Sequence, residues 1–259
     1  MFALERQDEI LQLIKERKSV SVNEISEELF VSCATVRRDL NAMEKAGLIR
    51  RTHGGAVLAG STSDESGILI REQEHVIEKK SIAAIAVKLI KNGNSLYLDS
   101  SSTVGKIVPL LSRFSFISIV TNGLKNALLL SETSNARVYV TCGIIQSQSN
   151  SILGADTVEY CSKLHTDVAF ISCNGISATN GVTEANLEQA KVKQTMLKNS
   201  AVKVLLADSS KFGKTFMAKT SDFSDIDYLI TDKLPSPELK SAIEKGGCRI
   251  LTPLNHSLI

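Results

Sequence analysis

Residues 30–55 read FVSCATVRRDLNAMEKAGLIRRTHGG, a stretch that predicts a helix followed by a hairpin. Val36, Leu40 and Met43 recur at helical spacing, so they form one apolar face. Ser32 is a favourable N-cap, because its hydroxyl can accept a hydrogen bond from a free backbone N–H in the first turn. We therefore expect a helix that buries one side and presents the other to a partner.

The open face of this helix carries the side chains that can contact DNA. Arg37 and Arg38 lie near the N-terminal end of the helix, which is the part of a recognition helix that reaches base edges. The helical residues that we predict to contact DNA are Ser32, Ala34, Thr35, Arg37, Arg38 and Asn41.

Two further helical patterns precede this one. Ser21 and Glu24 have the spacing of a capping box, while Val20 and Ile25 have that of the accompanying hydrophobic staple. An apolar stripe in residues 10–14 predicts an earlier helix. Three short helices in about fifty residues, the last with exposed arginines, are typical of a helix-turn-helix domain.

A hairpin is predicted after the third helix, in the run LIRRTHGGAVL. Gly54 and Gly55 permit a tight turn, and we expect Arg50, Arg51 and His53 to project towards DNA phosphates. An isolated arginine pair is usually a solvated surface charge. Here residues 32–55 carry five basic side chains against two acidic ones, a net charge of +3, whereas the whole chain carries +2. This concentration of charge, together with the cap, the periodicity and the turn, favours double-stranded DNA as the partner.

Length and composition define the broad class of the protein. With 259 residues, 43% of them hydrophobic, the chain can form one large or two ordinary domains. The polar start and the absence of a long apolar run predict no signal peptide and no membrane span, hence a cytoplasmic protein. Five scattered cysteines without a C-x-x-C pair argue against a disulfide framework and a metal site, and we expect no cofactor.

The chain divides into three predicted parts. Residues 1–57 form the winged helix-turn-helix domain, residues 58–74 a linker, and residues 75–259 an α/β domain. The linker includes residues 59–67, which are small and polar, as in flexible connections.

Helical and strand patterns alternate in the C-terminal part, which predicts a mostly parallel sheet covered by helices. The helical stretches are residues 79–93, 123–132 and 186–200. The apolar strand candidates are residues 95–100, 116–121, 137–142, 168–173 and 202–208, with weaker ones at 227–231 and 248–251.

Polar residues follow most of these strands, and ligands in such folds bind beyond the carboxyl ends of the strands. The run from Asp99 to Thr103 leads into a predicted helix start, where hydroxyls and free N–H groups can hold an anion. The other polar ends are residues 121–123, 141–143, 173–175 and 208–211. Each is also a common turn sequence, and a lysine nearby can be merely solvated. Together they favour a pocket for a polyhydroxylated, phosphorylated ligand.

The segment from Arg6 to Gly55 resembles the N-terminal domain of the DeoR/GlpR family of bacterial transcriptional regulators. The resemblance is carried by VS-x-x-TVRRDLN at residues 31–41 and RTHGGA at residues 51–56. It continues through LDSSST, VTN, GVTEANLEQAKVKQTM, LADSSKFGK and DYLITD, which are similar to the family's sensor domain, itself similar to ribose-5-phosphate isomerase.

This resemblance implies a regulator, most often a repressor of sugar-metabolism genes, that is relieved or modulated by a phosphorylated sugar effector. By position it implies the following effector-binding residues: Asp99, Ser100, Ser101, Ser102, Thr103, Thr121, Asn122, Gly143, Asn174, Gly175, Glu184, Lys193, Asp208 and Lys211.

One departure from the family pattern bears on the alternatives. The loop commonly written G-x-D-G-[IV] reads SCNGI at residues 172–176, and Asn174 cannot act as a carboxylate base. A sugar-phosphate isomerase with an added DNA-binding domain is therefore the less favoured alternative. A C-terminal domain that serves only for dimerisation is another. Two operator half-sites need at least two copies of the chain, so we expect a homodimer or homotetramer.

Overall fold

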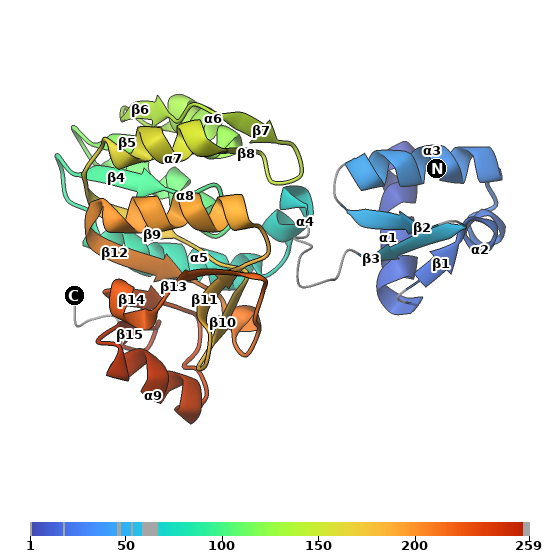
Figure 1. Ribbon diagram of the computed structural model, residues 1–259. Helices are drawn as coiled ribbons and strands as arrows, with labels where there is room; N and C mark the ends of the chain where they lie inside the picture. The colour runs from blue at the N-terminus through green and yellow to red at the C-terminus, as the bar shows by residue number, and fades with distance from the viewer. Residues whose placement is uncertain (1, 18, 46–47, 53, 59–66, 256–259) are drawn as a thin grey trace. The chain divides into compact units, whose positions relative to one another are not determined.

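The computed structural model describes residues 2–17, 19–45, 48–52, 54–58 and 67–255 (Figure 1). The chain forms two compact units, Met1–Arg71 and Glu72–Ile259. Residues 59–66 of the predicted linker lie outside the described part. The second half of that linker contains a short helix, α4 (Ile68–Gln73), at the boundary between the units.

The first unit is a winged helix-turn-helix. Its elements are α1 (Ala3–Arg17), β1 (Ser19–Ser21), α2 (Val22–Glu28), α3 (Cys33–Lys45), β2 (Ile49–Thr52) and β3 (Gly55–Leu58). The strands form an antiparallel sheet in the order β1-β3-β2. The capping box predicted at Ser21 and Glu24 is confirmed at the start of α2. Strand β1 was not predicted, because three residues are too short to show a periodic pattern.

The core of this unit confirms the predicted helix faces. Val36, Leu40 and Met43 are fully buried, and they pack with Ile10 and Ile25 from the two preceding helices. Strand β1 pairs with β3 as far as Gly55, where an added Cβ would lie 2.1 Å from the carbonyl oxygen of Val20. A side chain at this position would therefore force β3 away from β1.

The second unit is built on a seven-stranded sheet in the order β15-β14-β12-β9-β4-β5-β6, with all neighbouring strands parallel. In sheet order the strands are Arg249–Leu251, Tyr228–Ile230, Ser200–Leu206, Thr166–Ile171, Ser95–Leu98, Ser118–Thr121 and Arg137–Val140. Each corresponds to a predicted strand, the two weaker candidates included. The parallel α/β architecture is thus confirmed.

Helices lie against both faces of the sheet (Figure 1). They are α5 (Val76–Ala86), α6 (Leu124–Thr133), α7 (Ala155–Ser162), α8 (Leu187–Lys198) and α9 (Pro237–Lys245). Strand β4 shows why two layers are needed, since Leu96 and Leu98 belong to one buried cluster and Tyr97 to the other. Successive side chains of a strand point to opposite faces, so each face needs its own cover.

Two small sheets were not predicted. Strands β7 (Ile144–Gln146) and β8 (Ser151–Leu153) form a hairpin, and β10 (Gly175–Ser177), β11 (Gly181–Glu184) and β13 (Ala218–Ser221) form an antiparallel sheet. These strands have three or four residues each, too few for the alternation that marks a strand in sequence.

The structure also differs from the prediction after Thr103, where we expected a helix. Two short 3-10 segments, η2 (Val104–Lys106) and η3 (Val108–Arg113), take its place. Pro109 lies in this stretch, and proline cannot donate the backbone hydrogen bond that a longer α-helix would need. The helix N-terminus on which the predicted anion site depended is therefore reduced to a single short turn.

The strand order places the topological switch point between β4 and β9. From β4 the chain moves outward to β5 and β6, whereas from β9 it moves in the other direction to β12, β14 and β15. Ligand crevices of open parallel sheets lie at such a point, beyond the carboxyl ends of the two strands. Among the described residues, no helix has the length and apolar character required to cross a membrane.

Candidate functional site: a DNA-reading helix and a buried cluster at the strand ends

Helix α3 presents the predicted DNA-contacting side chains on its open face. Ser32, Ala34, Arg37, Arg38 and Asn41 are exposed, as expected for a recognition helix. The predicted N-cap is present, since the Ser32 hydroxyl accepts a hydrogen bond from the N–H of residue 35 at 3.2 Å. Thr35 itself is half-buried, and its hydroxyl lies 2.9 Å from that of the cap.

An ion pair that we did not predict fixes the rotation of α3. Asp39 is buried, and its Oδ2 atom lies 2.5 Å from Nε of Arg6, on α1. A second hydrogen bond of 3.1 Å joins the same two side chains, and it raises the pKa of the Arg6 guanidinium. Asp39 follows Arg38 directly, so tying the acid inward keeps the preceding arginine outward. In the sequence, the only indication of this ion pair is that the acidic Asp39 directly follows two arginines.

The wing is tied to the recognition helix. The Arg51 guanidinium donates a hydrogen bond to the side-chain oxygen of Asn41, and the Arg51 N–H donates to Glu44 Oε1 at 2.9 Å. Two residues predicted to contact DNA thus bind each other. His53 and the side chain of Arg50 lie outside the described residues, so their roles stay predictions.

Asp99 joins the two strands at the switch point of the second unit. Its Oδ1 accepts a hydrogen bond from the N–H of Ser101 at 2.8 Å, and its Oδ2 accepts one from the N–H of Ser172, also at 2.8 Å. Ser172 follows β9, so one fully buried carboxylate holds the ends of β4 and β9 together. The Ser101 N–H is therefore occupied by Asp99.

A buried lysine completes this arrangement. Nζ of Lys193, on α8, lies 3.4 Å from Asp99 Oδ2 and donates to the carboxylate of Glu184 and, at 2.9 Å, to the carbonyl of Ser172. All three charged side chains are buried. An ammonium group between two carboxylates satisfies charges that would otherwise be costly to bury.

Cys173 lies two residues after the end of β9 and is buried. Burial raises the pKa of its thiol, and the negative charge of Glu184 adds to the effect. The positive charges of Lys193 and Lys211 oppose this shift, and the negative charge of Asp208 adds to it, so all four charged side chains lie near enough to act on the thiol. The thiol is neutral at physiological pH and is not a nucleophile. The structure thus brings the predicted residues Glu184, Lys193, Asp208 and Lys211 to one region.

A neutral hydrogen-bond chain lies beside the charged one. The Ser151 hydroxyl donates to Ser100 Oγ at 2.6 Å, and Nε2 of Gln189 donates to Ser151 Oγ at 2.8 Å. Our sequence reasoning missed both Ser151 and Gln189. The signal for Gln189 was available, because it precedes Lys193 by four residues and so shares its helix face. Nothing local pointed to Ser151, which depends on the unpredicted β8.

Three buried oxygens in this region accept no hydrogen bond from the described residues: Asn122 Oδ1, Gln189 Oε1 and Asp208 Oδ2. All three side chains are at most 3% exposed. A buried acceptor without a donor costs about 1–3 kcal/mol. Hydroxyl groups of a ligand are donors of the required kind, so the region has the chemistry of a polyol site.

Other predicted site residues have turn or packing roles in the structure. Thr121 Oγ1 accepts from the N–H of Gly123 at 3.0 Å, and Asn174 Oδ1 accepts from the N–H of Ala185 at 3.1 Å. Gly143 has a φ of 137°, and a Cβ there would lie 2.2 Å from Thr157 Oγ1. At Gly175 a Cβ would lie 2.5 Å from a backbone oxygen. Ser102 and Thr103 are buried in the turn after β4.

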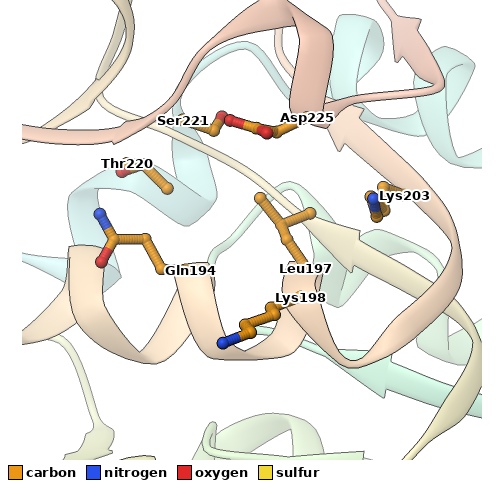
Figure 2. Close-up of a pocket in the computed structure, with 7 residues that line it drawn as sticks. All are labelled: Gln194, Leu197, Lys198, Lys203, Thr220, Ser221 and Asp225. Atoms are coloured by element: carbon orange, nitrogen blue, oxygen red, sulfur yellow. The ribbon is translucent and has the colours of Figure 1, made fainter.

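Among the surface pockets of the described residues, two lie next to elements that also carry the buried cluster or follow its strands. One of about 410 Å³ is lined by α8, β12, β13 and the 3-10 turn η5 (Phe223–Asp225), with Gln194, Lys198 and Lys203 around it (Figure 2). It lies at the C-terminal end of α8, away from the strand ends. A second pocket of about 400 Å³ includes Ser177, Phe212 and Glu238, from segments that follow β9, β12 and β14. The described residues contain no acidic, histidine or cysteine group arranged to hold a metal ion.

Comparison with known proteins identifies both units. Residues 6–62 match the DeoR-like helix-turn-helix domain, and residues 74–233 match the DeoR C terminal sensor domain. The HTH-type transcriptional regulator GolR of Listeria innocua is 34% identical over 95% of this chain and 97% of its own. The glycerol-3-phosphate regulon repressor of Escherichia coli is 31% identical over 89% of this chain and 91% of its own.

The solved structures that this chain resembles are more distantly related to it. A D-ribose-5-phosphate isomerase in complex with phospho-erythronic acid aligns with 52% of this chain and 52% of its own, at 18% identity and a TM-score of 0.38. This similarity is too low to carry an argument about activity. The relatives that match over most of the chain are named as regulators of transcription, and the sensor and helix-turn-helix models match both units, so the isomerase alternative is set aside.

Proposed function

Because the chain belongs to the DeoR family of DNA-binding transcriptional regulators, we propose that it represses genes of sugar metabolism and that a phosphorylated sugar bound by the sensor domain weakens its hold on DNA. Its partners are then an operator in double-stranded DNA, a sugar phosphate and further copies of the chain. It acts in the cytoplasm, where the operator is accessible. The name of the Escherichia coli relative, a glycerol-3-phosphate regulon repressor, supports repression and a phosphorylated effector.

The observation that carries the effector proposal is the group of buried acceptors at the strand ends. Asn122 Oδ1, Gln189 Oε1 and Asp208 Oδ2 lack donors among the described residues. Sugar hydroxyls supply such donors, and Lys211, which is only half-buried, supplies a positive charge for a phosphate. The effector-binding set predicted from the sequence is retained, with Gln189 added to it.

A ligand screen with the full chain tests the effector proposal. Phosphorylated sugars and their unphosphorylated counterparts are compared by thermal shift, each at millimolar concentration. A ligand present at one hundred times its Kd stabilises the folded state by about 2.7 kcal/mol, a shift of several degrees for a domain of this size. We expect at least one phosphorylated compound to stabilise the protein while its unphosphorylated counterpart does not.

The DNA part is tested separately. Duplexes selected by the protein from a random pool are used in mobility-shift titrations, with and without the stabilising compound. We expect a specific site whose complex dissociates when the sugar phosphate is added. Selection of no preferred sequence would contradict the regulator proposal. If no phosphorylated sugar changes the DNA affinity and none raises the thermal stability of the protein, the effector proposal is contradicted. The C-terminal unit would then be a dimerisation module.

A further inference from the structure

Strand β6 is the last strand on its side of the seven-stranded sheet, and no described strand pairs with its outer edge. The N–H groups of Arg137 and Thr141 donate to the carbonyls of Ile117 and Thr121, both at 3.0 Å. These residues therefore face β5. Because alternate residues of a strand point their peptide groups in opposite directions, the N–H and C=O groups of Val138 point outward. The edge thus offers unpaired backbone groups to another chain.

Large apolar side chains accompany this open edge. We define the edge surface as the exposed side chains Leu128 (62% exposed), Tyr139 (39%), Val140 (43%), Ile144 (75%) and Ile145 (59%). The run from residue 139 to residue 145 reads YVTCGII and contains no charge. Proteins normally protect a free edge with lysine, proline or a short strand, and exposed apolar patches mark interaction sites. Here the strand is short and Arg137 at its start is exposed, but the residues that follow Arg137 along this edge are uncharged and largely apolar.

We propose that the edge surface binds a second copy of this chain, with the two β6 strands pairing antiparallel across a twofold axis. A strand that meets its own copy about such an axis is necessarily antiparallel, and the same apolar side chains then lie on both sides. An uncharged run favours an equally uncharged partner, because a charged one would lose its hydration without gaining an ion pair, and the edge surface of a second copy is uncharged in the same way. A stable dimer buries about 800 Å² of accessible surface on each partner. Five large side chains exposed to this degree supply much of that area.

The inference rests on the proposed function, which needs two winged helices for two operator half-sites. It also brings the interface close to the effector region. Ile144 pairs with Leu153 across the β7–β8 hairpin, and Gln146 pairs with Ser151, whose hydroxyl binds Ser100 and Gln189. One short hairpin therefore carries both interface side chains and a residue of the buried cluster.

Sedimentation equilibrium of the full chain tests the interface. We expect the unmodified chain to be an even-numbered oligomer at micromolar concentration and Ile144→Lys to halve its mass, because a buried lysine would face its own copy. Leu234→Lys is the matched control: Leu234 is 54% exposed and follows β14, at the far side of the sheet, so its mass stays that of the unmodified chain. A monomeric unmodified chain, or an Ile144→Lys variant of unchanged mass, overturns the proposal.

Cysteine cross-linking tests the same contact without disturbing it. Cys142 is exposed within the edge run, and the half-buried Cys33 can be removed as Cys33→Ser. In the proposed pair the two Cys142 residues lie at opposite ends of the β6 strands, about 20–25 Å apart at about 3.3 Å per residue. A bismaleimide with a spacer of that length should give a covalent dimer of Cys33→Ser and none of Cys33→Ser/Cys142→Ser. Absence of the covalent dimer in a preparation that sediments as an oligomer places the contact elsewhere and overturns the proposal.

These outcomes are separate from the test of the proposed function. A chain that sediments as a monomer but binds its selected DNA and responds to a sugar phosphate refutes this interface alone. A chain that forms the cross-linked dimer but selects no DNA sequence refutes the regulator proposal alone.

Discussion

Nζ of Lys193 lies 3.4 Å from Oδ2 of Asp99, and the two side chains are 6% and 1% exposed. The same ammonium group binds the carboxylate of Glu184, which is equally buried. This contact joins α8 to the carboxyl end of β4 at the switch point of the sheet. One cation thus holds two acids in the interior, at the place where the effector is proposed to bind.

Lys193→Met should destabilise the sensor domain strongly. Removing one partner of a buried ion pair leaves uncompensated charge and lowers the free energy of unfolding by about 3–5 kcal/mol. Urea denaturation followed by circular dichroism measures the loss. Lys191→Met, at an exposed position on the same helix, should change stability by less than about 0.5 kcal/mol. Equal stability of the two variants would show that the buried contact contributes little.

Arg38→Ala should remove specific DNA binding and leave the fold intact, because Arg38 is exposed on α3. A good arginine contact to a base edge contributes about 1–3 kcal/mol of discrimination, which corresponds to roughly five- to 150-fold in affinity. Mobility shifts with the selected duplex and a scrambled one measure this. Arg113→Ala, an exposed arginine of the second unit, is the control. An unchanged preference for the selected duplex would mean that α3 does not read the bases.

Gln189→Met should weaken the response to the sugar phosphate without changing DNA affinity. It removes both the donor to Ser151 and the buried oxygen that lacks a partner. We expect the effector concentration for half-maximal release of DNA to rise at least tenfold. Gln194→Met, at an exposed position of the same helix, should behave as the unmodified protein. A normal response of Gln189→Met would exclude this residue from the effector site.

The capping box of α2 predicts a pH dependence of the first unit. Hydrogen bonds from Ser21 lower the pKa of Glu24, so this carboxylate stabilises the fold at neutral pH and loses its contribution as pH falls through its folded pKa. Thermal unfolding of the unmodified chain and Glu24→Gln should therefore differ at pH 7 and converge at acidic pH. Ser21→Ala should cost about 1 kcal/mol at neutral pH. A difference independent of pH would argue against the carboxylate as the cause.

Local patterns predicted much of the fold. The apolar face of α3, the cap at Ser32 and the seven main strands depend on neighbours within a few residues, and all are present. Prediction failed for β1, β7, β8, β10, β11 and β13 because such short strands are stabilised by their partners. It also failed after Thr103, where proline limits the chain to 3-10 turns.

The sequence by itself determined a DNA-reading helix, a wing and a parallel α/β domain with polar strand ends, because capping, periodicity and charge act between near neighbours. Only the tertiary structure decided what those polar residues do. The strand order sets β4 beside β9, so Asp99 meets Ser172 and Lys193 instead of facing solvent. It also leaves the outer edge of β6 without a partner strand among the described residues. Both depend on contacts between distant parts of the chain, which local spacing does not encode.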